Sequence, residues 1–211
     1  MDGLGLRERK KLRTKRALVA AAVRLFAEKG YEQTTVAEIA AAADVATKTF
    51  FNYFPSKDDV LFASHEERRA LLLRVIAERR PEDTLRDTLE RIGEELWQLM
   101  LTGSTEPPPE LATTRVRLIL NEPPLRARML RLLLDAQHDL AEALRAAYPD
   151  QLDEITSAAV VGAWLGAAQA GALVGIARGD DMERIWQNGM RAARIAMDGL
   201  DALPLPRRQE E

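Results

Sequence analysis

The chain has 211 residues, of which 46% are hydrophobic, 30% charged and 5% aromatic. This composition suits one or two folded domains and excludes collagen-like, fibrous and wholly disordered chains. The absence of cysteine excludes disulfide frameworks, thiolate zinc sites and cysteine nucleophiles. The hydrophilic segment from Met1 to Arg16 lacks the apolar core of a signal peptide, so we expect a cytoplasmic protein.

The net charge of −3 conceals an asymmetry along the chain. Residues 1–57 carry eleven Lys or Arg against six Asp or Glu, a net charge of +5, and they include all six lysines. The remaining residues carry a net charge of −8. A basic N-terminal quarter on an acidic body indicates that the N-terminal end meets a polyanion.

Two helices are predicted at the start of the chain. Apolar residues at helical spacing predict a first helix over about 9–29, which Gly30 ends. Thr35 and Glu38 have the spacing of a capping box, in which the hydroxyl and the carboxylate each accept a backbone N–H of the other residue. A second helix therefore begins directly after Thr35.

A third helix follows after a turn of only three residues, 44–46. Phe50 and Phe54 are four apart and are expected to face inward, and Pro55 ends the helix. Two short helices joined in this way form a helix-turn-helix.

From residue 56 onward the pattern predicts only helices, which gives an all-α fold. They are expected over about 56–80, 82–101, 110–120, 124–147, 151–178 and 181–201, with a loop over 102–109. We expect a DNA-binding domain with a basic arm over 1–57, a second helical domain over 58–203 and a flexible tail over 204–211.

The exposed face of the third helix carries the most specific signal. Lys48 and Asn52 are four apart and project together, with Thr47 and Thr49 beside them. Lys suits the guanine acceptors of the DNA major groove, Asn suits adenine, and Thr can contact a thymine methyl group. A plain solvated helix face is the alternative, but the capping box, the short turn and the basic lead-in favour DNA.

Phosphate contacts are expected around this helix. Thr35, with the amides at the start of the second helix, can hold one phosphate, and Lys57 can hold another. Tyr53 offers a hydroxyl group to the same DNA backbone.

Three sequence segments, Ala27–Tyr31, Thr34–Ala40 and Thr49–Lys57, resemble the DNA-binding domain of TetR-family transcriptional regulators. The resemblance extends from about residue 13 to residue 63. It implies a homodimeric, all-helical repressor that binds a palindromic operator and responds to a small-molecule effector.

The resemblance also assigns site residues. The positions that read the groove in this family are Thr47, Lys48, Thr49 and Asn52, and those that contact the DNA backbone are Thr35, Tyr53 and Lys57. Three positions depart from the family pattern. Asp44 replaces the usual Gly of the turn but tolerates a left-handed backbone, Ala46 replaces a Ser cap so that Thr47 could cap the helix instead, and Phe51 replaces a Tyr.

The segment Ser157–Ile176 contains no charged residue and is long enough to span a membrane. Because it is rich in Ala and Gly, we interpret it as a helix packed closely against other helices. Either an intrachain contact or a two-fold dimer interface would use its small residues, and the resemblance favours the dimer. The predicted interface residues are Ala158, Gly162, Gly166, Ala170, Met190, Ala193 and Met197.

A ligand pocket needs apolar walls with a few polar groups. The candidate residues are Trp97, Leu101, Arg115, Leu118, Met129, Leu133, Gln137 and Gln169, and simple core packing is the alternative for most of them. No sequence feature identifies the effector.

Enzyme interpretations find little support in the sequence. Phosphate-binding and dinucleotide-binding glycine motifs are absent, and we predict neither a catalytic residue nor a cofactor. One helical face could in principle bind a metal, through Asp135, His138, Asp139 and Glu142, but an acidic solvent-exposed face accounts for it better. A regulator of the same fold that activates or responds to a protein partner, a helical enzyme and a ligand-sequestering bundle remain as alternatives.

Overall fold

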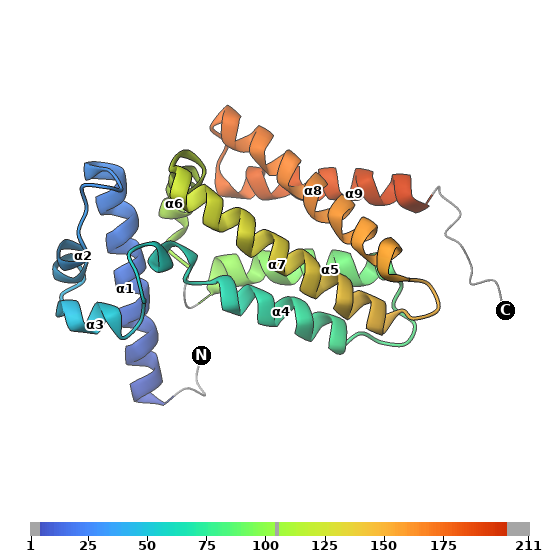
Figure 1. Cartoon of the computed structure of the whole chain (residues 1–211), viewed down its shortest axis with the longest axis horizontal. Coiled ribbons are helices and arrows are strands. Elements are labelled where there is room, and N and C mark those ends of the chain that lie inside the picture. The colour runs from blue at the N-terminus through green and yellow to red at the C-terminus, as the bar shows by residue number, and fades with distance from the viewer. Residues whose placement is uncertain (1–4, 104–105, 202–211) are drawn as a thin grey trace. The chain divides into compact units, whose positions relative to one another are not determined.

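The computed structural model describes residues 5–103 and 106–201, and within these ranges all regular structure is helical (Figure 1). The predicted all-α fold is confirmed. The helices are α1 (Leu6–Lys29), α2 (Val36–Ala42), α3 (Thr47–Phe51), the short 3₁₀ helix η1 (Asp58–Phe62), α4 (His65–Ala77), α5 (Leu85–Thr102), α6 (Pro109–Asn121), α7 (Pro123–Ala147), α8 (Glu154–Arg178) and α9 (Met182–Asp201). The expected tail over 204–211 lies outside the described residues.

The chain divides into two compact units. The first unit runs up to Glu66 and also takes in Gln98–Met129, and the second unit comprises Glu67–Trp97 and the chain from Leu130 onward. Helix α6 and the start of α7 therefore belong with the N-terminal helices. The domain boundary expected after residue 57 remains a prediction.

The core of the first unit forms around one face of α1. Val19, Val23 and Phe26 lie on this face and are at most 1% exposed, and Ile39 of α2 and Phe50 of α3 are completely buried against the same cluster. The cluster also includes Ile119 of α6 and Leu125 of α7. Burial of these side chains holds α2 and α3 against α1.

The fourth helix differs from the prediction. The sequence pattern predicted one helix over about 56–80, whereas the structure has η1 over Asp58–Phe62 and then α4 over His65–Ala77. Ser56 Oγ donates to Asp59 Oδ2 at 2.6 Å and accepts from Asp59 N at 3.4 Å. These bonds satisfy polar groups at the start of η1, as the bonds between Thr35 and Glu38 do at the start of α2. Nothing in the structure explains the break between η1 and α4.

In the second unit, α8 and α9 approach each other closely through glycines. A Cβ atom added at Gly171 would lie 2.3 Å from the carbonyl oxygen of Asn188, and one added at Gly189 would lie 2.9 Å from that of Ala168. Real Cβ atoms do not approach so closely, so these two glycines are required for the contact between the helices.

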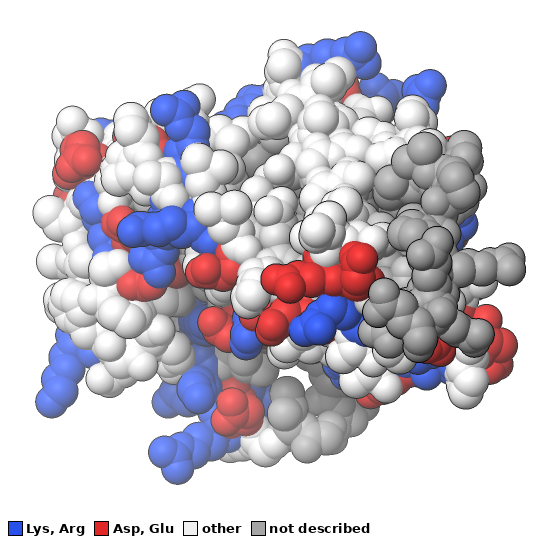
Figure 2. All heavy atoms as spheres, turned by 45° about the vertical axis from the view of Figure 1, so that its right-hand side comes forward, with Lys and Arg blue, Asp and Glu red and all other residues white. Residues whose placement is uncertain are grey.

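Among the described helices, α8 alone has the length and the apolar composition of a membrane-crossing helix. Only 22% of its most apolar 18-residue window is buried within the chain. Exposed apolar side chains along it include Ile155, Leu173 and Val174. One face of the molecule shows a broad area without charged side chains (Figure 2).

Candidate nucleic-acid interface

The capping box predicted at the start of α2 is present. Glu38 N donates to Thr35 Oγ1 at 3.2 Å, and Thr35 N donates to Glu38 Oε2 at 2.8 Å. Lys29, at the end of α1, also forms an ion pair with the Glu38 carboxylate. The hydrogen bond from Lys29, together with those from Thr35, lowers the pKa of Glu38 from 4.5 to about 2.

We expect Glu38→Gln to reduce the loss of stability in acid. The ionised carboxylate stabilises the folded protein above about pH 4.5, and this contribution is lost as the pH falls from 4.5 towards 2, because the folded-state pKa is the lower one. The variant should therefore be less stable than the wild type at pH 7 and lose less stability between pH 4.5 and 2. Urea unfolding across this pH range measures the difference.

Glu32→Gln is the matched control for this experiment, because Glu32 is an exposed carboxylate in the same unit. The control should follow the wild-type pH curve. If the Glu38→Gln and wild-type curves run parallel between pH 4.5 and 2, the ionised Glu38 carboxylate, with its bonds to Lys29 and Thr35, does not contribute to stability in solution.

The turn between α2 and α3 has the conformation that a helix-turn-helix needs. Asp44 adopts a left-handed backbone with φ of 54°, the only positive φ at a non-glycine position among the described residues. Val45 N then donates to the Ala40 carbonyl at 3.0 Å and closes the turn. Asp is one of the few residues that tolerate this conformation, so the prediction for Asp44 is confirmed.

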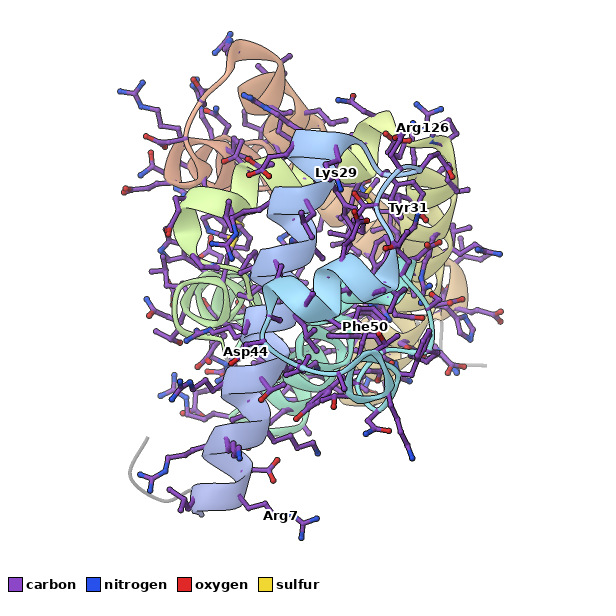
Figure 3. The ribbon with its side chains drawn as sticks, turned by 90° about the vertical axis from the view of Figure 1, so that its left-hand side faces the viewer. Arg7, Lys29, Tyr31, Asp44, Phe50 and Arg126 are labelled. Atoms are coloured by element: carbon purple, nitrogen blue, oxygen red, sulfur yellow. The ribbon has the colours of Figure 1, made fainter. Side chains whose placement is uncertain are left out.

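Helix α3 buries one face and exposes the other, as Figure 3 shows for Phe50 on its inner side. Phe50 is completely buried and Phe54 is 3% exposed. On the outer side, Thr47, Lys48 and Asn52 are exposed. Three of the four predicted base-reading side chains are therefore exposed, and the fourth, Thr49, is half-buried.

The Thr47 hydroxyl forms no cap hydrogen bond at the N-terminus of α3, so it is available for other contacts. Ala46 is the N-cap, and no side chain forms a cap hydrogen bond there. Phe51 belongs to the same exposed surface, with 52% of its surface accessible, although the sequence analysis did not count it among the site residues. A phenyl ring in this position can contact a thymine methyl group.

The predicted phosphate-binding residues are already engaged within the first unit. The Thr35 hydroxyl belongs to the capping box. Lys57 Nζ donates to the Tyr31 carbonyl at 2.7 Å and lies 4.1 Å from the centre of the Tyr31 ring. Tyr53 is half-buried beside Phe54, with 6.4 Å between their ring centres. Lys57 keeps further N–H donors for a phosphate while it holds Tyr31.

The predicted pocket residues do not line a single cavity among those described. Trp97 stacks on Trp186 with 5.6 Å between ring centres, and both line an open hollow of about 380 Å³ between α5 and α9. Gln137 lines a separate hollow of about 290 Å³ between α7 and α8. In the second unit Leu133 and Gln169 are half-buried.

The other predicted pocket residues belong to the first unit. Leu118 and Met129 pack against its core, and Leu101 is 46% exposed. Arg115 is 5% exposed and is paired with the buried Glu106, with 2.8 Å between Nη2 and Oε2. The sequence analysis missed Glu106, which lies in the predicted loop and carries no spacing signal that links it to Arg115.

The predicted interface residues fall into two groups. On α8, Ala158 and Ala170 are exposed, and a Cβ atom added at Gly162 or Gly166 would meet nothing within 4 Å. On α9, by contrast, the predicted residues pack within the chain: Ala193 is completely buried, Met197 is 5% exposed, and the Met190 side chain lies against Gly93 of α5. Ile195, which is 63% exposed, is the large apolar residue that α9 presents to solvent.

No group of three or more potential metal ligands occurs among the residues that the structure describes. On the acidic face of α7, His138 Nε2 lies 3.8 Å from Glu142 Oε2, and both side chains are exposed. Asp139 instead forms a 2.5 Å ion pair with Arg69 of α4.

Comparison with known proteins identifies the N-terminal helices. Residues 18–63 match the family described as bacterial regulatory proteins of the tetR family. The chain is 49% identical over 59 residues to the transcriptional regulator TcmR of Streptomyces glaucescens, a match that covers 28% of this chain and 26% of TcmR. It is 33% identical over 101 residues to the transcriptional repressor Rv3405c of Mycobacterium tuberculosis, covering 46% and 54% of the two chains.

The matches to these curated relatives span between about a quarter and a half of their length. A solved structure of SmeT, the repressor of a multidrug efflux pump of Stenotrophomonas maltophilia, is similar in fold, with a TM-score of 0.59 and 19% identity over 88% of this chain and 89% of SmeT. The complex of SmeT with triclosan has a TM-score of 0.60 and 19% identity over 94% and 99% of the two chains.

These comparisons agree with the helix-turn-helix geometry of the first unit. The relatives are transcriptional regulators by name, in agreement with the prediction that the chain is not an enzyme. Residues 18–63 therefore form a domain of the tetR family of bacterial regulatory proteins.

Proposed function

We propose that the protein is a cytoplasmic transcriptional repressor that binds a palindromic operator as a homodimer and is released by a small-molecule effector. The observation that carries this proposal is the outer face of α3, where Thr47, Lys48 and Asn52 are exposed while Phe50 is buried. Side chains of these types match the hydrogen-bonding pattern of base edges in the major groove. The family membership of residues 18–63 supports the same assignment.

The test is selection of bound fragments from random duplex DNA by the purified full chain at about 150 mM salt, where weak nonspecific binding is screened. We expect enrichment of one inverted repeat. Its half-site spacing should be close to one helical turn, about 34 Å, or a multiple of it. A folded dimer that enriches no sequence would contradict the proposal.

Base-reading and phosphate-binding residues should respond differently to substitution. We expect Lys48→Ala and Asn52→Ala each to relax the preference at one base pair, by roughly 1–3 kcal/mol. Lys57→Ala should weaken binding to all sequences alike, because a phosphate contact carries no sequence information. Anisotropy titrations against single-base operator variants measure both effects. The same profile for all three variants would refute this division of roles.

The homodimer is proposed to form through the exposed face of α8. Ala158, Gly162, Gly166 and Ala170 are uncovered in the single chain, and the adjoining Ile155 is 81% exposed. Small residues every four positions let a second helix approach closely, and a two-fold axis would pair the strip with itself. This partner accounts for the apolar surface of α8 without a membrane.

The effector is proposed to act through geometry. A ligand in the helical body would shift α4 and so change the distance between the two α3 helices of the dimer. Both α3 helices must contact the operator at the same time, so the altered distance would weaken DNA binding. The ligand can do so only by binding the released state more tightly than the DNA-fitting state. SmeT, which has a similar fold, was solved with triclosan, and this supports a small organic effector. The hollow that Trp97 lines between α5 and α9 is the first place to look for the effector-binding site.

Two other functions are open to the same test. An activator or a protein-controlled regulator of this fold would also enrich a DNA sequence, but no small molecule would release it. A helical enzyme or a ligand-sequestering bundle would show no sequence-selective DNA binding whose affinity falls steeply with salt.

A further inference from the structure

The hollow between α5 and α9 has an aromatic wall. Trp97 of α5 and Trp186 of α9 are both half-buried, and their rings stack at an angle of 28° with 5.6 Å between the ring centres. Met190 of α9, whose side chain lies against Gly93, adds a further apolar surface. All the lining residues belong to the second unit. A ligand that covers these rings removes apolar surface from water, which favours its binding.

Two carboxylates stand beside this wall. Glu90, Glu94 and Trp97 are spaced by four and then three residues along α5, so they share one face of the helix. Glu90 Oε1 lies 3.8 Å from Arg86 Nη1. Glu94 is exposed and forms no ion pair within the part of the chain that the structure describes. The Glu94 carboxylate can therefore pair with a positive charge that a ligand brings.

The electrostatics of the hollow favour a cation. Its lining contains the two carboxylates and one basic residue, Arg194 of α9, which gives a formal net charge of −1. The faces of the two indole rings carry the negative end of the aromatic quadrupole and attract cations as well. The carboxylates and the rings thus select the same sign of charge.

Other classes of ligand fit this hollow less well. A neutral ligand over the rings would take the Glu94 carboxylate partly out of water without supplying a compensating charge. An anion would be repelled by both carboxylates. A hard metal ion needs several oxygen ligands, and no group of three or more potential metal ligands occurs among the described residues.

We propose that the hollow between α5 and α9 binds organic cations that carry one positive charge on an aromatic or other apolar body, and that such cations are the effectors of the protein. The apolar body covers the rings of Trp97 and Trp186, and the positive nitrogen lies beside the carboxylate of Glu94. This inference rests on the proposed function, because it assigns the proposed effector to a chemical class.

Helix α5 is tied to the helix that the proposed mechanism moves. Arg91 follows Glu90 on α5, and its Nη2 donates to the Val75 carbonyl of α4. A ligand that contacts both α5 and α9 fixes the position of α5 relative to α9. Any shift of α5 on binding is then passed to α4 through Arg91.

The test compares three small probes of similar shape on the purified full chain. The cation is benzyltrimethylammonium, the neutral probe is its carbon isostere neopentylbenzene, and the anion is phenylacetate. Binding is measured by calorimetric titration and by the quenching of tryptophan fluorescence. Operator affinity is measured by anisotropy with and without each probe.

Two neighbouring glutamates supply matched variants. Glu94→Gln removes the carboxylate beside the rings. Glu95→Gln is the control, because Glu95 is also exposed on α5 but lies 3.8 Å from Arg74 and lines a different hollow. Trp186→Leu removes one ring of the wall, and circular dichroism checks that each variant is folded.

We expect the wild type to bind the cation more tightly than the neutral isostere and to bind the anion least. Glu94→Gln should weaken binding of the cation by about two- to fivefold, the range for an exposed charge pair, and leave the neutral probe unaffected. Trp186→Leu should weaken the cation by about fivefold or more, through the lost ring face and the lost contact area. Glu95→Gln should keep the wild-type preference. A saturating cation should lower operator affinity by about 5–150-fold, the usual range of coupling between two sites.

A wild type that binds the cation no better than the neutral isostere would overturn the inference. An equal loss of preference in Glu94→Gln and Glu95→Gln would do the same, because the total charge of α5 would then explain it. These two exposed positions decide the outcome even if Trp186→Leu does not fold.

The effector assignment is tested apart from the proposed function. A cation that binds in the hollow but leaves operator affinity unchanged would overturn its assignment as the effector. A wild type that enriches no operator would contradict the proposed function whatever the probes do, and the titrations would still decide whether the hollow selects cations.

Discussion

Phe50→Ala should lower the free energy of unfolding of the first unit by about 3–5 kcal/mol, the cost of truncating a fully buried phenyl ring. Phe50 is completely buried at the point where α3 meets α1. Its ring centre lies 5.5 Å from that of Phe54, and the pair buries the C-terminal end of the short helix α3 and the residues that follow it. With only five residues, α3 depends on this packing more than on its own hydrogen bonds.

The neighbouring residue is a matched control. Phe51 belongs to the same helix and is 52% exposed, with its ring centre 5.6 Å from that of Phe50. Phe51→Ala should cost less than about 1 kcal/mol, since little of its surface leaves water on folding. Urea unfolding of both variants, followed by circular dichroism, measures the difference. Similar losses of stability for the two would mean that the buried and exposed faces of α3 have been assigned wrongly.

The local structure of the first unit could be predicted from sequence because each feature depends on neighbouring residues. Thr35 and Glu38 form a capping box through bonds that span three positions, and Asp44 can adopt a left-handed backbone by its own chemistry. The inward position of Phe50 follows from helical spacing. By contrast, the apolar pattern predicted one helix over about 56–80 and did not reveal the break between η1 and α4.

The helical body was less predictable because periodicity does not reveal what covers a helix face. Met197 and Ile195 are both apolar residues of α9, yet one is buried in the second unit and the other faces solvent. The glycines of α8 divide in the same way: Gly171 touches α9, whereas Gly162 meets nothing within 4 Å. Which apolar face packs within the chain is decided by tertiary contacts that no local pattern encodes.

Arg115 illustrates the same limit, and its substitution has the second large expected effect. Arg115→Met should destabilise the first unit by about 3–5 kcal/mol, because Glu106, only 2% exposed, would keep a buried charge without this cation. A residue whose role is to bind an effector would behave differently: its loss would weaken effector binding and leave the unfolding free energy near the wild-type value.

A double-mutant cycle with Glu106→Gln separates these roles. Removing the charge of Glu106 first should make the later change at Arg115 less costly, so the two losses of unfolding free energy should sum to more than the loss in the double variant, with a coupling of about 0.5–3 kcal/mol. Urea unfolding of all four proteins supplies the cycle. Additive losses would show that the 2.8 Å contact between Arg115 and Glu106 carries no net energy. Strong coupling would assign Arg115 to the fold of the first unit, and the search for effector-binding residues would then move to the hollow beside Trp97.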